Sequence, residues 1–259
     1  MVVMHWLITL GLIAGCGRIG FDPTDDGTGG GSNDGIGGGG VVVDSGGGGG
    51  GSGDAPATMP TGHYITGGST TSVAPATSIT TMTGPLTDTN MVIVVAIHWT
   101  NSTSSVSTVQ DSFGNGFSMI GSLQRYNGAS QVIWYKKVTA GTTIQVFFNQ
   151  AAPSISVKWA AYRDIDQAST FVMPGFIGGS GTGTTAATSM LTIGTTAVVV
   201  ASLGSRAADA TAGPGFTQRH KSGGGVLEDL EASAGMVKAT AILNSSNDWI
   251  IQMAALRPL

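Results

Sequence analysis

Short apolar runs recur along the chain from residue 61 to the end, and polar or glycine-containing segments separate them. The runs last about five to nine residues and are rich in Val, Ile, Thr and aromatic residues, which is typical of β-strands. The segments between them contain Gly, Asn, Asp and Ser, which favour turns. The clearest strands are predicted at 91–99, 117–123, 131–138, 142–148, 154–162, 188–193, 197–203, 236–243 and 248–256.

Two kinds of pattern occur among these runs. In 142–148 and 154–162 apolar and polar positions alternate, as in a strand with one covered face. In 91–99 and 197–203 both faces are apolar, so these strands should be central and covered on both sides. The sequence therefore predicts an all-β fold over 61–259, an antiparallel two-sheet β-sandwich that is jelly-roll-like. Segment 226–235 offers a short helical alternative, but flanking glycines favour a loop and an edge strand.

The first fifteen residues form a different kind of segment. Residues 2–15 are apolar apart from His5 and Thr9. This run is shorter than the roughly 20 residues that a membrane-spanning helix needs, and its length suits the core of a signal peptide. It ends at Ile13, Ala14, Gly15 and Cys16. This tetrapeptide resembles the lipobox of bacterial lipoprotein precursors.

The resemblance implies a signal peptide over 1–15, cleavage between Gly15 and Cys16, and acylation of Cys16, which would bind the lipid bilayer. Gly17 stands where an Asp would favour inner-membrane retention, which points to the outer membrane or cell surface. Residues 1–5 contain no Lys or Arg, so the start codon is open to question. The alternative is an ordinary buried apolar segment with an incidental cysteine.

Residues 16–60 are predicted to be a disordered, glycine-rich linker. The whole chain contains 42 glycines, more than is usual, and most of the excess lies between Gly27 and Gly53. No apolar periodicity accompanies it. Such a segment cannot bury enough apolar surface to offset the entropy lost on ordering. A flexible coil of this composition and length spans roughly 30–37 Å, enough to hold a domain clear of a membrane surface.

The charge distribution restricts the class of partner. Charged residues make up 10% of the chain, and the linker holds six acidic residues against Arg18 alone. From residue 60 onward, ten basic residues stand against nine acidic ones, so no strong field attracts a polyanion, and nucleic-acid binding is not expected. The single cysteine excludes an intramolecular disulfide, and with four scattered histidines it also disfavours a Cys/His zinc site.

A second resemblance covers about residues 60–259. The segments TVQDSFGNGFSMIG, VIWYKKVTAGTTIQVFF, KWAAYRDID, GPGFTQR and SSNDWIIQMAALRP follow one another as in a β-sandwich module of secreted and cell-surface bacterial proteins. The resemblance lies in strands and turns, so it implies a fold and no particular activity.

Enzyme motifs are absent from the sequence. There is no G-x-S-x-G nucleophile elbow and no H-E-x-x-H zinc motif. The acidic cluster of Glu228, Asp229 and Glu231 is expected to be a solvated strand edge. His98 lies in a central apolar run and is expected to be a core histidine with its hydrogen bonds satisfied. A binding or structural role is favoured over catalysis.

Calcium is the only cofactor that the sequence suggests. Asp111 and Asn115 in DSFGNG, with Asp164 and Asp166, carry the oxygen atoms that hold calcium in loops. The alternative is that these side chains cap their own turns.

Aromatic side chains are the candidate ligand-binding residues, because aromatic rings stack on sugars. Trp134 and Trp159 share faces with apolar neighbours and are expected in the core, whereas Tyr135 and Tyr162 fall on lysine-bearing faces and are expected to be exposed. Tyr126 is a third candidate. We predict an outer-membrane or cell-surface lipoprotein whose sandwich is a binding or structural module for carbohydrate or an envelope protein. The alternative is a hydrolase or lyase that acts on polysaccharide.

Overall fold

The computed structural model describes residues 62–86, 88, 90–138 and 141–259. The predicted signal peptide and linker lie outside the described residues. The described chain is all-β, as the sequence predicts, and its strands are β1 Tyr64–Ser72, β2 Ala76–Leu86, β3 Met91–Trp99, β4 Val106–Asp111, β5 Ser118–Tyr126, β6 Ala129–Val138, β7 Gly141–Ala152, β8 Ile155–Tyr162, β9 Phe171–Ala187, β10 Leu191–Ile193, β11 Ala197–Ser205, β12 Ala210–Ala212, β13 Thr217–Ser222, β14 Gly225–Ala232, β15 Gly235–Val237 and β16 Thr240–Leu256.

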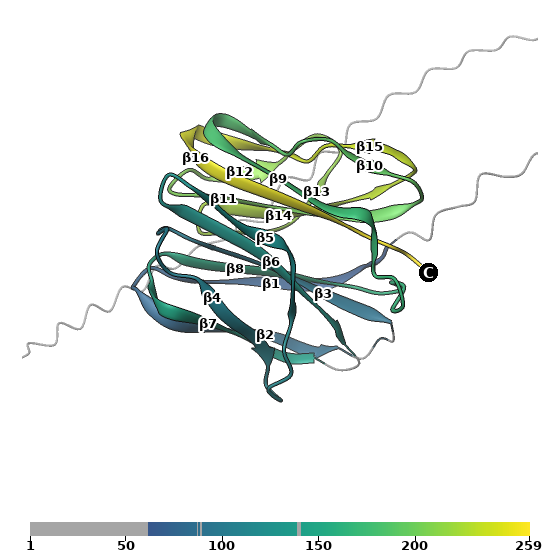
Figure 1. The fold of residues 1–259 in the computed structure, drawn as a ribbon, viewed down its shortest axis with the longest axis horizontal. Helices are drawn as coiled ribbons and strands as arrows, with labels where there is room; N and C mark the ends of the chain where they lie inside the picture. The colour runs from purple at the N-terminus through teal and green to yellow at the C-terminus, as the bar shows by residue number, and fades with distance from the viewer. Residues whose placement is uncertain (1–61, 87, 89, 139–140) are drawn as a thin grey trace, which may run out of the picture. The chain divides into compact units, whose positions relative to one another are not determined.

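The strands form stacked antiparallel sheets (Figure 1). Outer sheet 1 has the order β2-β7-β4, and inner sheet 1 has the order β1-β8-β3-β6-β5. Inner sheet 2 has the order β9-β16-β11-β14-β13. Outer sheet 2 lies beyond inner sheet 2. It consists of the pair β10-β15 and of the start of β16, which pairs with the end of β9 and with β12. The figure shows these layers in succession, with β2, β4 and β7 at one side and β10 and β15 at the other.

The chain folds as two jelly rolls in tandem. In jelly roll 1, strands β1 to β8 form two sheets with orders 1-8-3-6-5 and 2-7-4, and the nested pairs β1–β8, β2–β7 and β3–β6 are those of this fold. In jelly roll 2, strands β9 to β16 repeat the inner order as 9-16-11-14-13. The end of β9, the start of β16 and β12 pair in an order that repeats 2-7-4. The sequence predicts one sandwich over 61–259, and the described part of that span contains two.

Strand register makes β3 and β8 equivalent residue by residue to β11 and β16, and the paired part of β6 equivalent to β14. Val95 pairs with Trp159 on one side and Trp134 on the other, and Ala201 pairs in the same way with Met253 and Glu228. The β5–β6 and β13–β14 connections are both two-residue turns, Asn127–Gly128 and Gly223–Gly224. All four turn residues have positive φ, between 43° and 77°, as type I′ hairpins require.

The two inner sheets pack face to face about a pseudo-two-fold axis that runs along the strands, and we call this interface the seam. β1 and β8 contact β13, and their equivalents β9 and β16 contact β5. His98 and Gly204 are equivalent positions in contact with each other, since a Cβ on Gly204 would lie 2.2 Å from His98 Cδ2. A contact between equivalent positions places the axis between them. The connections β1–β2, β3–β4, β5–β6 and β7–β8 and their equivalents therefore lie at one common end, which we call the turn end.

Three apolar clusters fill the spaces between the layers. One lies between inner and outer sheet 1, one between inner and outer sheet 2, and one in the seam. Every residue of β3 and of β11 is buried, which confirms that 91–99 and 197–203 are central strands covered on both faces. Each strand contributes alternate side chains to two different clusters, because successive side chains of a strand point to opposite faces.

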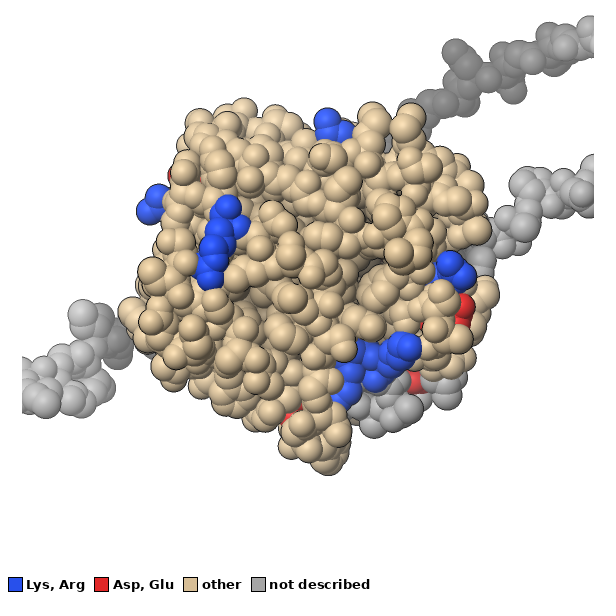
Figure 2. Space-filling view, viewed as in Figure 1, with Lys and Arg blue, Asp and Glu red and all other residues tan. Residues whose placement is uncertain are grey.

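Segment 226–235 is neither helix nor sheet edge. Its first part is β14, which lies between β11 and β13, and β13 is the edge strand. The surface carries few charges, and one face is mostly uncharged (Figure 2). The described part of the chain contains no helix long and apolar enough to cross a bilayer.

Candidate functional site

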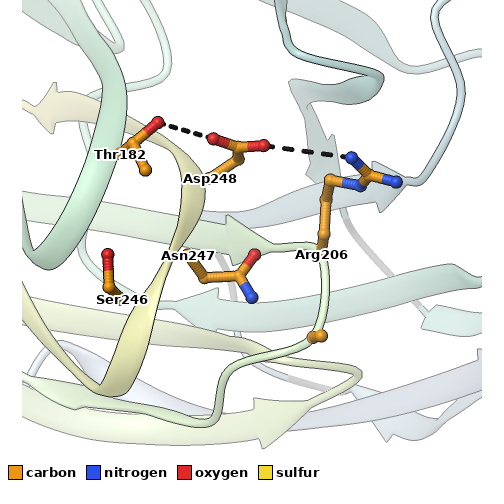
Figure 3. Close-up of a pocket in the computed structure, with 6 residues that line it drawn as sticks. Thr182, Arg206, Ser246, Asn247 and Asp248 are labelled. Atoms are coloured by element: carbon orange, nitrogen blue, oxygen red, sulfur yellow. Dashed lines mark hydrogen bonds and ion pairs between the residues drawn. The ribbon is translucent and has the colours of Figure 1, made fainter.

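A polar cavity of about 430 Å³ opens at the turn end, where the two jelly rolls meet. Jelly roll 2 lines it with Thr182 of β9, with Arg206 and Ala207 of the β11–β12 loop, and with the segment 246–248 of β16. Figure 3 shows the side chains of Thr182, Arg206 and Asp248 in a row, with Asn247 and Ser246 beside them. We call this cavity the Asp248 pocket.

The carboxylate of Asp248 is fixed by donors from both jelly rolls. Oδ1 accepts hydrogen bonds from Thr182 Oγ1 at 2.6 Å and from Asn127 Nδ2 at 3.2 Å. Oδ2 lies 3.9 Å from Arg206 Nη1. The hydrogen bonds from Thr182 and Asn127, with the Arg206 charge, hold the pKa of Asp248 below its ordinary value. The pocket therefore holds an ionised, oriented carboxylate at neutral pH.

Arg206 is positioned by its own backbone and by the opposite hairpin. Its amide N donates to Asp248 O at 3.4 Å, and Nη1 donates to Asn127 O at 3.2 Å. Its side chain is still 50% exposed, so most of the guanidinium donors face solvent.

Tyr126 stands beside the pocket and is the one predicted aromatic candidate that the structure brings to it. Its hydroxyl lies 3.3 Å from Thr182 Oγ1, and the side chain is half-buried. Tyr126 ends β5, directly before the Asn127–Gly128 turn, so the hairpin delivers an aromatic residue and an amide together.

The other two tyrosine candidates lie in the seam, and the expectation that Tyr162 is exposed is wrong. Tyr162 is fully buried and packs edge-on against Tyr64, with ring centroids 6.1 Å apart. Tyr135 is half-buried and packs edge-on against Phe171 at 4.7 Å. The lysine-bearing face of inner sheet 1 suggested solvent, but jelly roll 2 covers it. The predicted core positions of Trp159, which is buried, and Trp134, which packs against the same cluster, agree with the structure.

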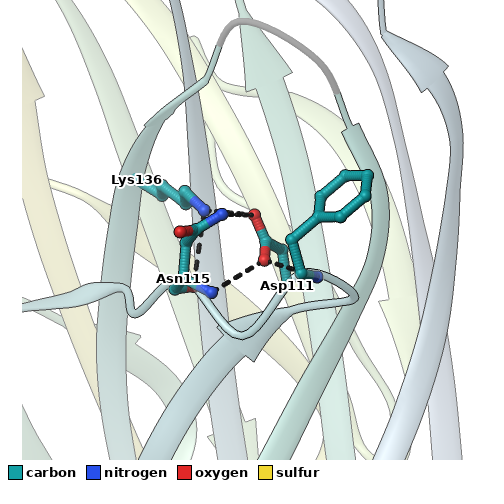
Figure 4. Close-up of polar contacts among 4 residues, drawn as sticks. Asp111, Asn115 and Lys136 are labelled. Carbon is teal, nitrogen blue, oxygen red and sulfur yellow. Dashed lines mark hydrogen bonds and ion pairs between the residues drawn. The ribbon is translucent and has the colours of Figure 1, made fainter.

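Asp111 and Asn115 lie together, and their geometry is that of a capped turn (Figure 4). Asp111 Oδ1 accepts from the backbone N of Phe113 and of Asn115, both at 2.9 Å, and Oδ2 accepts from Asn115 Nδ2 at 3.2 Å. Lys136 Nζ forms an ion pair with the same Oδ2. Burial alone would raise the pKa of Asp111, but the hydrogen bonds from Lys136 and the turn lower it to about 2.

These contacts favour the turn-capping alternative over calcium, because an ammonium group already balances the carboxylate charge. Asp164 and Asp166 lie on the separate segment that follows β8, and Asp166 caps its own turn through the N–H groups of Ala168 and Ser169. Among the residues that the structure describes, no group of three or more His, Cys, Asp or Glu side chains is placed to hold a metal ion.

Two of the three acidic residues on β14 are buried and Glu231 is half-buried, so the expectation of a solvated edge is wrong. Glu228 is 0% exposed inside jelly roll 2, and Asp229 is 4% exposed in the seam. Arg219 Nε donates to both carboxylate oxygens of Asp229, at 2.8 and 2.9 Å, and its guanidinium stacks on the Tyr64 ring at 4.1 Å. β13 pairs along the outer side of β14, so these positions are not at the sheet edge, and the network ties β13 to β1 across the seam.

The centre of the seam also contains ionisable groups. His98 is 1% exposed, and neither ring nitrogen has a hydrogen-bond partner among the described residues, so it is a core histidine but not a satisfied one. Burial, with the nearby Lys158, lowers the pKa of His98 to about 3, so the ring is neutral. Lys158 is fully buried, and its Nζ donates to Ser156 Oγ at 3.2 Å. Both groups are buried and neither lines the Asp248 pocket, so we assign them a structural role.

Comparison with known proteins does not identify this chain. No protein-family model matches the sequence, and no curated protein or solved structure matches it either.

Sequence reasoning missed most of the pocket. Thr182, Arg206 and Asp248 are far apart in the chain, and no local motif joins them. The one local indication of the pocket is the segment NSSND at 244–248, which has the composition of a polar loop of the kind that presents binding groups. Gly15 and Cys16 lie outside the described residues, so the lipobox stays a prediction.

Proposed function

We propose that this protein is a cell-surface lipoprotein whose paired jelly rolls bind carbohydrate at the Asp248 pocket. The observation that carries the proposal is the fixed Asp248 carboxylate beside the exposed Arg206 guanidinium, in an open polar cavity. Sugar hydroxyls both donate and accept hydrogen bonds, so a carboxylate acceptor beside amide and guanidinium donors suits them. Tyr126 supplies an aromatic ring at the rim, where the apolar face of a pyranose can pack.

Pre-formed geometry supports binding as the role of this pocket. Asp248 is held by Thr182 and Asn127 before any ligand arrives, so little side-chain entropy remains to be lost on binding. Glycoside hydrolysis generally uses two carboxylates on either side of the scissile bond. Asp248 is the one carboxylate among the described residues that line the pocket, which favours binding over the hydrolase alternative.

The test is glycan binding by the full chain and by Asp248→Asn. The wild-type protein should bind a subset of glycans on an array, and Asp248→Asn should lower the affinity for them at least about tenfold, as expected when a charged hydrogen bond is lost. Asp209→Asn is the matched control, because Asp209 is an exposed carboxylate outside the pocket, paired with Lys221. Absence of binding to any glycan, or equal binding by Asp248→Asn, would refute the proposal.

The anchor in this proposal is lipid on Cys16. A single apolar run followed by Cys16 and a glycine-rich segment has the order expected of an anchored, tethered domain. Cys16→Ala should abolish metabolic incorporation of labelled palmitate and leave a precursor longer by the fifteen residues of the signal peptide, resolved by mass spectrometry. Thr195→Ala, a surface change in the folded part, should label normally. Unchanged labelling of Cys16→Ala would exclude the anchor.

A further inference from the structure

A second cavity, of about 270 Å³, adjoins the Asp248 pocket. Jelly roll 1 contributes Thr71–Val73, Thr100 and Ser154 to its lining, and jelly roll 2 contributes the Gly223–Gly224 turn. Arg206 and Ala207 line both cavities, so the two cavities lie on either side of one loop segment at the turn end. We call this second cavity the Ser154 pocket.

The two cavities occupy equivalent positions on the two jelly rolls. Ile155 and Trp249 are equivalent in the register of β8 and β16, so the residues before them, Ser154 and Asp248, are equivalent as well. Ser72 pairs with Ile155 and Gly181 pairs with Trp249, which makes Val73 the equivalent of Thr182. The pseudo-two-fold axis therefore relates the Ser154 pocket to the Asp248 pocket.

The hairpin turns that flank the two cavities follow the same relation. Asn127–Gly128 of jelly roll 1 reaches across the seam to Asp248, and Gly223–Gly224 of jelly roll 2 reaches across it to Ser156 and Thr71. The Gly223–Gly224 hairpin thus lines the Ser154 pocket, and Asn127 of the other hairpin holds the carboxylate that lines the Asp248 pocket.

The chemistry of the two cavities differs although their position is the same. The Asp248 pocket holds a carboxylate, an amide and a guanidinium, whereas jelly roll 1 lines the Ser154 pocket with hydroxyl groups, a valine and an isoleucine. Thr100 stands at the position equivalent to Arg206, next after the buried ends of β3 and β11. One cavity therefore has strong polar anchors and the other has weak ones, and the half-exposed Arg206 lies between them.

We propose that the two cavities are subsites of one groove across the seam, which binds an extended polysaccharide chain rather than a single terminal sugar. This inference rests on the proposed function and adds the form of the ligand. A chain held in the Asp248 pocket presents its neighbouring sugars to the Ser154 pocket at high effective concentration. Linked contacts of this kind raise affinity by a factor on the order of 10² without either contact being strong.

The test measures affinity of the full chain for size ladders of one to eight sugars, printed on an array for each of several backbones, both neutral and uronate-containing. We expect weak or no signal for mono- and disaccharides and a rise of about 10- to 100-fold with length for the backbone that binds. Equal signals for short and long members would overturn the groove and leave the Asp248 pocket intact. Absence of signal on every ladder would overturn both.

A double variant separates the subsites. Thr100→Val with Ser154→Gly removes two hydroxyl groups from the Ser154 pocket, and glycine suits the positive φ of 48° at position 154. This variant should lose about tenfold in affinity for the long chain and keep the wild-type affinity for short fragments. Thr195→Ala, in the exposed β10–β11 turn at the opposite end of the strands, is the control and should bind as wild type. Unchanged affinity of the double variant for long chains would refute the second subsite.

Discussion

Replacing Lys158 by methionine should raise the free energy of unfolding at pH 7 by about 1–4 kcal/mol, the stabilisation found where buried ion pairs are replaced by apolar groups of similar volume. The Lys158 side chain is fully buried in the seam, and no carboxylate among the described residues pairs with it. Methionine has a similar length and flexibility and can fill the same space. Ser156, which accepts the Lys158 hydrogen bond, retains Ser222 O as an acceptor for its own hydroxyl.

The pH dependence of stability distinguishes this effect from simple repacking. Burial lowers the pKa of Lys158 from its ordinary 10.5 to about 7. Between these values the unfolded chain binds more protons than the folded chain, so this residue makes wild-type stability rise with pH from about 7 to 10.5. The full difference corresponds to roughly 5 kcal/mol, at about 1.4 kcal/mol for each pKa unit. Lys158→Met should lack this rise.

Denaturant unfolding at pH 7, 8 and 9 measures the prediction as a difference between wild type and variant. Lys238→Met is the matched control, because Lys238 is exposed on the chain between β15 and β16. The gain from Lys158→Met should shrink as the pH rises, while Lys238→Met should stay close to wild type throughout. A gain that is independent of pH would mean that packing and not charge is responsible.

Glu228→Gln should have the opposite pH dependence, with a gain of about 2–4 kcal/mol at pH 8 and little change at pH 4.5. Burial raises the pKa of Glu228 from its ordinary 4.5 to about 8, against the hydrogen bond that Gly213 N donates to Oε2 at 3.1 Å. Between these values the folded chain binds more protons than the unfolded chain. The contribution of Glu228 to the free energy of unfolding is therefore at its maximum below pH 4.5 and is lost as the pH rises to about 8. Glutamine keeps an acceptor for Gly213 N and has no charge to bury.

Glu231→Gln is the control for Glu228, because it lies on the same strand and is only half-buried. Chemical unfolding at pH 4.5, 6 and 8 should show a growing gap between Glu228→Gln and wild type, and a much smaller one for Glu231→Gln. If the difference in free energy of unfolding between Glu228→Gln and wild type were the same at every pH, or absent at pH 8, the inference that Glu228 is buried in its neutral form would be contradicted.

Much of the strand content of this fold follows from the sequence, because the central strands are continuous apolar runs. The edge strands β1, β2 and β9 were not predicted, and their composition explains the failure. These strands are rich in Gly, Thr and Ser, and some of their glycines lie directly against large side chains of neighbouring strands. A Cβ on Gly68 would lie 2.8 Å from the Trp159 ring, and one on Gly181 would lie 2.8 Å from Trp249. Packing from elsewhere in the chain selects these residues, and local propensity does not.

The tandem repeat is visible in the sequence as a short repeated motif, which the pattern of apolar runs alone does not reveal. The tetrapeptides Gly114–Phe117 and Gly213–Phe216 read GNGF and GPGF, and each directly precedes an equivalent strand, β5 or β13. Without the repeat, the second face of inner sheet 1 has no cover, which is why Tyr162 was expected at the surface. The acidic residues of β14 were expected there because 226–235 was interpreted as a loop and an edge strand, whereas β13 pairs beyond β14. Most of the candidate pocket could not be predicted, because Thr182, Arg206 and Asp248 come from separate segments of jelly roll 2 that meet only in the folded chain, and Asn127 joins them from jelly roll 1.

The equivalence of the two halves has a consequence for how this molecule can change. In a dimer of identical chains, every substitution appears at both symmetry-related positions, so each must suit both sites at once. Here one polypeptide carries both copies, and each position is inherited separately. Glu228 can stand where its counterpart is Trp134, and Asp248 where its counterpart is Ser154, without altering the other copy. Covalent linkage thus lets one half specialise in recognition while the other keeps the shared architecture.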